Sequence, residues 1–150
     1  MKIKNQMKLV FLSLPENVAL ARITVAAFAS QLEMTLEDLE EIKVATSEAV
    51  SNSIIHGYDN DPNKSVTVIA TIRETTLEIT IEDEGKGIPD VARAMQPAYS
   101  TDPERMGLGF VFMQSFMDRV DVQSEVNKGT KVLLVKNTAP AVATAIQDKN

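Results

Sequence analysis

The chain has 150 residues, of which 44% are hydrophobic and 24% are charged, and its formal net charge is −6. This length and balance predict one globular domain that is large enough to bury a core. The acidic charge argues against direct nucleic-acid binding, because no basic stripe is present to neutralise phosphates, and the lack of cysteine excludes disulfides and thiolate metal sites.

The N-terminal residues and the hydropathy pattern predict where the protein is found. Met1 to Leu14 lacks the small-residue cleavage pattern of a secretory signal, and no apolar stretch reaches membrane-spanning length. We therefore expect a cytoplasmic protein that contacts neither a membrane nor nucleic acid directly. Any effect on transcription would then act through a protein partner.

Apolar residues recur at helical spacing in some segments and alternate in β-branched runs in others, which predicts a succession of helices and hairpins. Thr35 and Asp38 have the spacing of a capping box at the start of the second helix, and Gly57 supplies its end. In chain order, the predicted elements are a strand (7–14), a helix (15–33), a second helix (35–56), a hairpin (65–73 with 76–82), a short helix (89–97), a loop (98–106), a helix (107–118) and a second hairpin (120–126 with 130–136).

The two hairpins require antiparallel pairing, and the chain offers few crossovers for parallel strands. The sequence therefore predicts an α/β protein of the α+β two-layer sandwich type, with a mixed, largely antiparallel sheet and the helices packed on one face. Residues 1–136 form one predicted domain. Residues 137–150 are rich in Ala and Thr without a pattern, which predicts a disordered tail.

Glu48 and Asn52 lie late in the second helix and are four residues apart, so they share one helical face. An Asn side-chain oxygen suits Mg²⁺, and a nearby carboxylate can take a proton from an attacking hydroxyl or water. An exposed polar face would also explain the pair, but the small apolar residues around it (Ala45, Ala49 and Val50) disfavour that interpretation.

Asp83 follows a predicted strand and is in phase with the apolar residues of 77–81, so it points toward the core if the strand continues. A buried carboxylate needs hydrogen-bond donors, and the exocyclic amino group of adenine would be one. Alternatively, the strand ends at Glu82 and Asp83 starts a turn, which Gly85 and Gly87 would fit equally well.

Gly107, Leu108 and Gly109 open a predicted helix, where glycines let backbone N–H groups approach an anion. A flexible loop end is the alternative. Thr130 begins the last strand in phase with its apolar residues, so its hydroxyl can reach a ligand or satisfy the local backbone.

The motifs of other nucleotide-binding families are absent from the sequence. It contains no GxxxxGK[ST] and no HRD or DFG set, and the run from Gly85 to Asp90 lacks the third glycine of the dinucleotide fingerprint. His56 lies one residue before the predicted helix end, which is more typical of a capping or packing residue than of a catalyst.

Taken in this order, the motifs resemble the Bergerat-type ATP-binding fold that gyrase, the heat-shock chaperone ATPase and histidine kinases share. The pair on the second helix matches the N box of that superfamily, the Asp83 motif its first glycine box and the Gly107 motif its second. Within the superfamily, the runs LARITVAAFASQL, SEAVSNSIIHGY and DEGKGIPD are similar to the anti-sigma F factors of spore-forming bacteria, over nearly all of Lys8 to Lys136.

That resemblance implies a dimeric serine kinase that uses ATP and Mg²⁺. Such proteins hold a sporulation sigma factor inactive and phosphorylate a serine on an anti-anti-sigma partner. By motif match, Glu48 is the base, Asn52 the Mg²⁺ ligand and Asp83 the adenine contact. The other implied nucleotide-binding residues are Gly85, Gly87, Gly107, Leu108, Gly109 and Thr130.

The resemblance also concerns two arginines. Arg22 matches an arginine that the family uses at its partner-binding surface. Arg105 falls in the lid segment, but residues 100–106 are shorter than the family's lid by a residue or two, so the resemblance does not assign it to the γ-phosphate.

Three rival functions follow from the same features. A histidine-kinase catalytic domain would need a phosphoacceptor histidine on a dimerisation helix, and His56 lies inside the nucleotide motifs instead. A non-catalytic, ATP-gated binding module would not need Glu48. A stress-response anti-sigma kinase shares fold and chemistry and differs in its sigma partner, so only the resemblance disfavours it.

Overall fold

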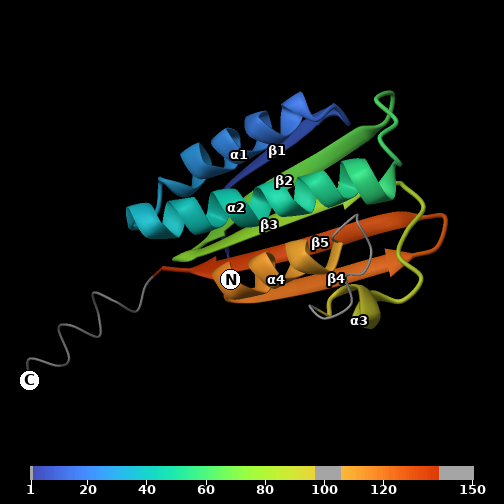
Figure 1. The fold of residues 1–150 in the computed structure, drawn as a ribbon. Coiled ribbons are helices and arrows are strands. Elements are labelled where there is room, and N and C mark those ends of the chain that lie inside the picture. Colours follow the sequence, from blue (N-terminus) through green and yellow to red (C-terminus); the bar gives the residue numbers. More distant parts are fainter. Residues whose placement is uncertain (1, 97–105, 139–150) are drawn as a thin grey trace, which may run out of the picture.

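The computed structural model describes residues 2–96 and 106–138. Within them the chain forms a five-stranded antiparallel sheet of order β1-β2-β3-β5-β4, with the helices on one face (Figure 1). The elements are β1 (Ile3–Leu12), α1 (Glu16–Ala29), α2 (Leu36–Asn52), the π-helix η1 (Ser53–Gly57), β2 (Ser65–Arg73), β3 (Thr76–Asp83), α3 (Val91–Ala94), α4 (Met106–Phe116), β4 (Arg119–Glu125) and β5 (Gly129–Asn137). The predicted α+β sandwich with a largely antiparallel sheet is confirmed, and every pairing between the described strands is antiparallel.

The alternation of apolar and polar residues in the central strands determines which face carries the helices. Val66 and Val68 of β2 and Leu77, Ile79 and Ile81 of β3 are buried, while the residues between them are partly exposed on the other face. Helix α2 packs against both α1 and α4 and is therefore the centre of the helical layer. No helix in residues 2–96 or 106–138 is long and apolar enough to cross a bilayer.

The element boundaries differ from the prediction at several places, among them the predicted helix of 89–97, where the structure has the four-residue α3 over Val91–Ala94. β1 begins at Ile3 because residues 3–6 pair with the end of β2, although they carry no apolar alternation. α1 ends at Ala29 rather than near residue 33, and the hydroxyl of Ser30 donates to the carbonyl of Ala27 there (2.6 Å). The helical path of α2 ends at Gly57 as predicted, but its last five residues form a π-helix.

Two further predictions fall largely beyond the residues that are described. The predicted loop of 98–106 lies outside them except for its last residue, which begins α4. Of the predicted tail, Asn137 is the last residue of β5, and Thr138 donates its backbone N–H to the carbonyl of Thr75 (3.1 Å).

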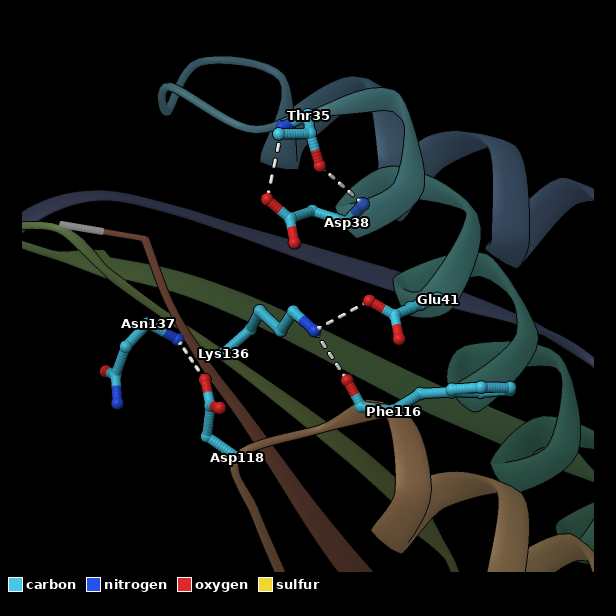
Figure 2. A network of polar contacts seen from close by, with 7 residues as sticks. All are labelled: Thr35, Asp38, Glu41, Phe116, Asp118, Lys136 and Asn137. Atoms are coloured by element: carbon cyan, nitrogen blue, oxygen red, sulfur yellow. Dashed lines mark hydrogen bonds and ion pairs between the residues drawn. The ribbon is translucent and has the colours of Figure 1, made fainter. Parts of the chain in front are cut away.

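The predicted capping box at the start of α2 is present (Figure 2). The backbone N–H of Asp38 donates to Thr35 Oγ1 (3.0 Å), and Asp38 Oδ2 accepts the backbone N–H of Thr35 (3.1 Å). These reciprocal bonds satisfy two of the donors that a helix start leaves free, which fixes the residue at which α2 begins.

Lys136 connects the end of β5 to the helices α2 and α4 (Figure 2). Its Nζ donates to the carbonyl of Phe116 at the end of α4 (2.6 Å) and lies 3.3 Å from Oε1 of Glu41 on α2. The two charged side chains are only 10% and 25% exposed. A cation at this place satisfies a terminal carbonyl of α4 and complements the helix dipole.

We expect Lys136→Met to lower the free energy of unfolding by about 1–3 kcal/mol, because it leaves a shielded carboxylate and a helix-end carbonyl without their partner. Urea unfolding followed by circular dichroism measures the change. The control is Lys128→Met, since the side chains of the Lys128–Glu125 pair are 71% and 70% exposed and such pairs contribute little. Equal losses in the two variants would contradict the structural role of Lys136.

Candidate functional site

Helices α2 and α4 bring the Glu48–Asn52 pair directly against Gly109. A Cβ atom on Gly109 would lie 3.0 Å from Glu48 Oε2 and 3.3 Å from Asn52 Nδ2, both inside ordinary contact distance. Gly109 is the fourth residue of α4 and directly follows the first turn, whose backbone N–H groups have no partner inside the helix. The two motifs that the sequence placed on different helices therefore meet at one point.

Asp83 is the last residue of β3 and its side chain is buried, as the phase of the strand predicts. Burial raises the pKa of its carboxyl, while hydrogen bonds from the backbone N–H of Gly85 (2.9 Å), the hydroxyl of Ser53 and the backbone N–H of Thr130 lower it. A carboxylate has about four acceptor positions. Three internal donors compensate its charge and leave capacity for one further donor from a ligand.

Around the carboxylate of Asp83, backbone segments pack against one another more closely than side chains at the glycine positions would permit. A Cβ on Gly85 would lie 2.1 Å from the carbonyl oxygen of Gly57, and one on Gly129 would lie 2.0 Å from the carbonyl oxygen of Asp83. Real Cβ atoms do not approach backbone that closely, so glycine is required at both positions. The end of η1, the end of β3 and the start of β5 can therefore converge around Asp83.

A pocket opens between these segments and α4. Its polar lining includes Asn52, Asp83 and Thr130, and Ile88 and Phe110 contribute apolar surface. Apolar walls with a few convergent polar groups are typical of small-molecule sites. The lining therefore offers apolar contacts together with the buried acceptor of Asp83.

Glu48 lies one turn before Asn52 and is half-buried. Burial raises the pKa of its carboxyl above the ordinary value of 4.5. A carboxyl group with a raised pKa, placed next to the start of a helix that can hold phosphate, is suited to accept a proton during group transfer.

The residues present fit a magnesium ion held mainly by phosphate. The amide nitrogen of Asn52 is buried and has no hydrogen-bond partner among the described residues, so it is free to donate to a phosphate oxygen, while the side-chain oxygen is the atom that suits Mg²⁺. Within the same residues, no three His, Asp or Glu side chains form a metal-binding group. Mg²⁺ commonly needs only one or two protein ligands when phosphate oxygens and water supply the others.

The remaining predicted residues are placed as follows. Gly87 lines the pocket and has a positive φ of 76°. Gly107 packs on the backbone before the undescribed segment, because a Cβ there would lie 2.8 Å from the carbonyl oxygen of Gln96, and the side chain of Leu108 is 39% exposed. Arg22 is on α1, where Nη1 lies 3.4 Å from Ser47 Oγ on α2. Arg105 lies outside the described residues.

Two serines at the site were not predicted. Ser53 is the first residue of η1 and donates its hydroxyl to Asp83. Ser124 of β4 bonds to the glycine-rich loop and to Thr130. The spacing of Ser53, one residue after Asn52 and four after Ala49, could have placed it on the pocket face of the helix, whereas no periodicity marks Ser124. His56 is buried and lines the pocket.

Comparison with known proteins gives a consistent result. Residues 11–136 match the family model of the histidine kinase-like ATPase domain. An anti-sigma F factor of Geobacillus kaustophilus is 51% identical over 142 residues, which are 93% of this chain and 97% of that protein. An anti-sigma F factor of Clostridium acetobutylicum is 48% identical over 139 residues, which are 91% of this chain and 96% of that protein.

Solved structures share the fold at much lower identity. The RsbU and RsbW domains of a Mycobacterium tuberculosis protein superpose with a TM-score of 0.64 at 15% identity, over 89% of this chain and 32% of that one. A blue-light activated histidine kinase of Erythrobacter litoralis gives a TM-score of 0.59 at 16% identity, over 87% of this chain and 43% of that one. These likenesses concern the fold alone.

We expect Gly109→Ala to weaken ATP binding on the order of tenfold, because its methyl group would displace Glu48 and Asn52. The fold should survive, since alanine favours a helix more than glycine does. Calorimetric titration with ATP and Mg²⁺ measures the affinity. Ser115→Ala, at an exposed position of the same helix, is the control. Native affinity in the Gly109 variant would show that this contact does not shape the site.

Proposed function

The chain belongs to the histidine kinase-like ATPase family and, within it, to the anti-sigma F factors, and from this we propose that it is an ATP-dependent protein serine kinase and an anti-sigma factor. The observation that supports the proposal most directly is the contact of Glu48 and Asn52 with Gly109, beside a pocket lined by Asp83. The proposed base and the proposed metal ligand thus lie against the N-terminal part of α4, beside a pocket that Asn52 also lines.

In this proposal the adenine amino group donates to Asp83, which keeps one acceptor position free. The backbone N–H groups at Gly107, Leu108 and Gly109 face the phosphates at the start of α4. Mg²⁺, held by the side-chain oxygen of Asn52 and by phosphate oxygens, would neutralise charge on the transferred phosphoryl group.

The proposed reaction transfers the γ-phosphoryl group of ATP to a serine hydroxyl of an anti-anti-sigma partner. The bond between the serine oxygen and the γ-phosphorus forms while the bond from that phosphorus to the β–γ bridging oxygen breaks. Glu48 takes the hydroxyl proton, and ADP leaves. The contribution of the protein is mainly to hold the groups in line and to supply the base.

The proposed partners are a sporulation sigma factor and the anti-anti-sigma substrate, with the protein acting as a homodimer in the cytoplasm. A stress-response anti-sigma kinase is the rival. Relatives at about 50% identity that are named anti-sigma F factors favour the sporulation assignment.

The direct test uses partners captured from a lysate of the source cells in the presence of ADP or of a non-hydrolysable ATP analogue. The captured proteins are then incubated with the native chain, ATP and Mg²⁺, and phosphoserine is mapped by mass spectrometry. We expect a sigma factor among the captured proteins and phosphoserine on a second, small one. Capture of partners without any phosphoserine on them would show that the chain acts as a binding module and not as a kinase.

We expect Glu48→Gln to slow phosphoryl transfer about 10²–10⁴-fold and to leave ATP affinity almost unchanged, because the amide keeps the shape and removes the base. Single-turnover transfer at saturating ATP measures the chemical step. Glu37→Gln, at an exposed position of the same helix, should transfer at the native rate.

The pH dependence gives a second readout for Glu48. Because burial raises the pKa of its carboxyl, the base is lost by protonation at a higher pH than an exposed glutamate would require. The native transfer rate should therefore fall on acidification around a midpoint above 4.5, and Glu48→Gln should lack this limb. The same limb in both proteins would mean that another group is the base.

We expect Arg22→Ala to weaken partner binding at least about tenfold and to leave ATP affinity unchanged. Arg22 lies on α1, which packs against α2 on the side away from α4 (Figure 1). Partner affinity in each nucleotide state is measured by surface plasmon resonance. Arg119→Ala, which removes an exposed arginine from β4, is the control. Equal effects of the two substitutions would remove Arg22 from the partner surface.

A further inference from the structure

Ser124 joins three segments next to the pocket. It faces Thr130 across the β4–β5 ladder. Its Oγ accepts the backbone N–H of Ile88 in the glycine-rich loop (2.8 Å), donates to the carbonyl of Gly129 (3.0 Å) and lies 2.8 Å from Thr130 Oγ1. A single hydroxyl therefore makes three hydrogen bonds.

Counting protons fixes the direction of the bond between the two hydroxyls. A serine hydroxyl has one proton, and a carbonyl oxygen can only accept, so the bond to Gly129 uses the Ser124 proton. The backbone N–H of Ile88 is itself a donor and needs none from Ser124. When Ser124 makes both of these bonds, its bond to Thr130 uses the proton of Thr130.

The consequence concerns what Thr130 offers a ligand. Thr130 lines the same pocket as Asp83, and its proton is committed to Ser124, so its oxygen offers only lone pairs there. The carboxylate of Asp83 is also an acceptor. Both side chains therefore present acceptors to the edge of a bound base.

We infer that Ser124 is a positioning residue for nucleotide specificity: by holding the Thr130 hydroxyl as an acceptor, it makes the pocket select a purine with an amino group at position 6 over one with a carbonyl. This inference rests on the proposed binding of ATP. A carbonyl oxygen in place of the amino group would face two acceptors without a proton between them. An unsatisfied buried polar group of this kind is what allows a site to reject a near-isostere.

A purely structural role for Ser124 makes a different prediction. If the hydroxyl only fastens the loop at Ile88 to the hairpin, its loss weakens every nucleotide alike. If it also sets the polarity of Thr130, its loss lets the threonine proton turn to a carbonyl oxygen, and discrimination falls. The ratio of two affinities separates the roles.

The experiment measures the affinities of ATP and ITP, which differ in the group at position 6 and in the proton on N1, by calorimetry with Mg²⁺. We expect the native chain to prefer ATP and Ser124→Ala to lower the ratio of the two affinities about tenfold. Ser124→Thr keeps the hydroxyl and should keep the native ratio. Thr71→Val, which removes a different hydroxyl bond from the same sheet, should also keep it.

A double-mutant cycle completes the test. In a Thr130→Val background no proton remains to be oriented, so adding Ser124→Ala should leave the ratio unchanged. If Ser124→Ala does not fold, Ser124→Cys replaces it, because a thiol is a weak hydrogen-bonding group of similar shape. An unchanged ATP-to-ITP ratio in the variant that folds overturns the inference. A native chain that binds both nucleotides equally well also overturns the inference, whereas a native chain that binds neither nucleotide contradicts the proposed function.

Discussion

The convergence of three backbone segments on the carboxylate of Asp83 is the constraint on which the rest of the site depends. The end of η1 and the loop after β3 approach so closely that only glycine fits at Gly85, and Gly129 permits the same at the start of β5. Asp83 accepts from Ser53 at the start of η1, from Gly85 in the loop after β3 and from Thr130 in β5. Burial of the Asp83 carboxylate therefore requires the close packing of these segments, and that packing requires glycine at positions 85 and 129. This explains why a motif with so little side-chain chemistry fixes the position of an acidic group so well.

Helix α4 contacts α2 near its N-terminal end, where the candidate site lies, and is anchored by Lys136 at its C-terminal end. Near the start of α4, Gly109 lies against Glu48 and Asn52. At the C-terminal end of α4, the carbonyl of Phe116 accepts a hydrogen bond from Lys136, whose Nζ also lies 3.3 Å from Glu41 in the N-terminal half of α2. Glu41, Glu48 and Asn52 all lie on α2. The distance between the Lys136–Glu41 ion pair and the candidate site is therefore set by helix geometry alone. A shielded ion pair is weak evidence for stability, but here it fixes the register of one helix along another.

The sequence predicted those features that repeat along one element and missed those that arise between elements. The phase of Asp83 in its strand, the spacing of Glu48 and Asn52, and the capping box of Thr35 are local patterns, and the structure has all of them. The π-helix could not be predicted, because 53–57 has ordinary helical composition and tertiary packing decides the winding. The role of Ser124 could not be predicted either, since its three partners come from a loop and from the start of β5, which no periodicity relates.

The acidic charge of the chain constrains how a polyanionic nucleotide could be held. The chain has a net charge of −6, and no lysine or arginine is among the described residues that line the pocket. In the proposed complex, Mg²⁺ and the unpaired N–H groups at the start of α4 would balance phosphate charge. Both depend on the position of α4, because Asn52 and Gly109 are in contact across the two helices. Any partner that shifts α4 relative to α2 would then alter metal and phosphate binding together, which links the nucleotide state to the surface that a partner meets.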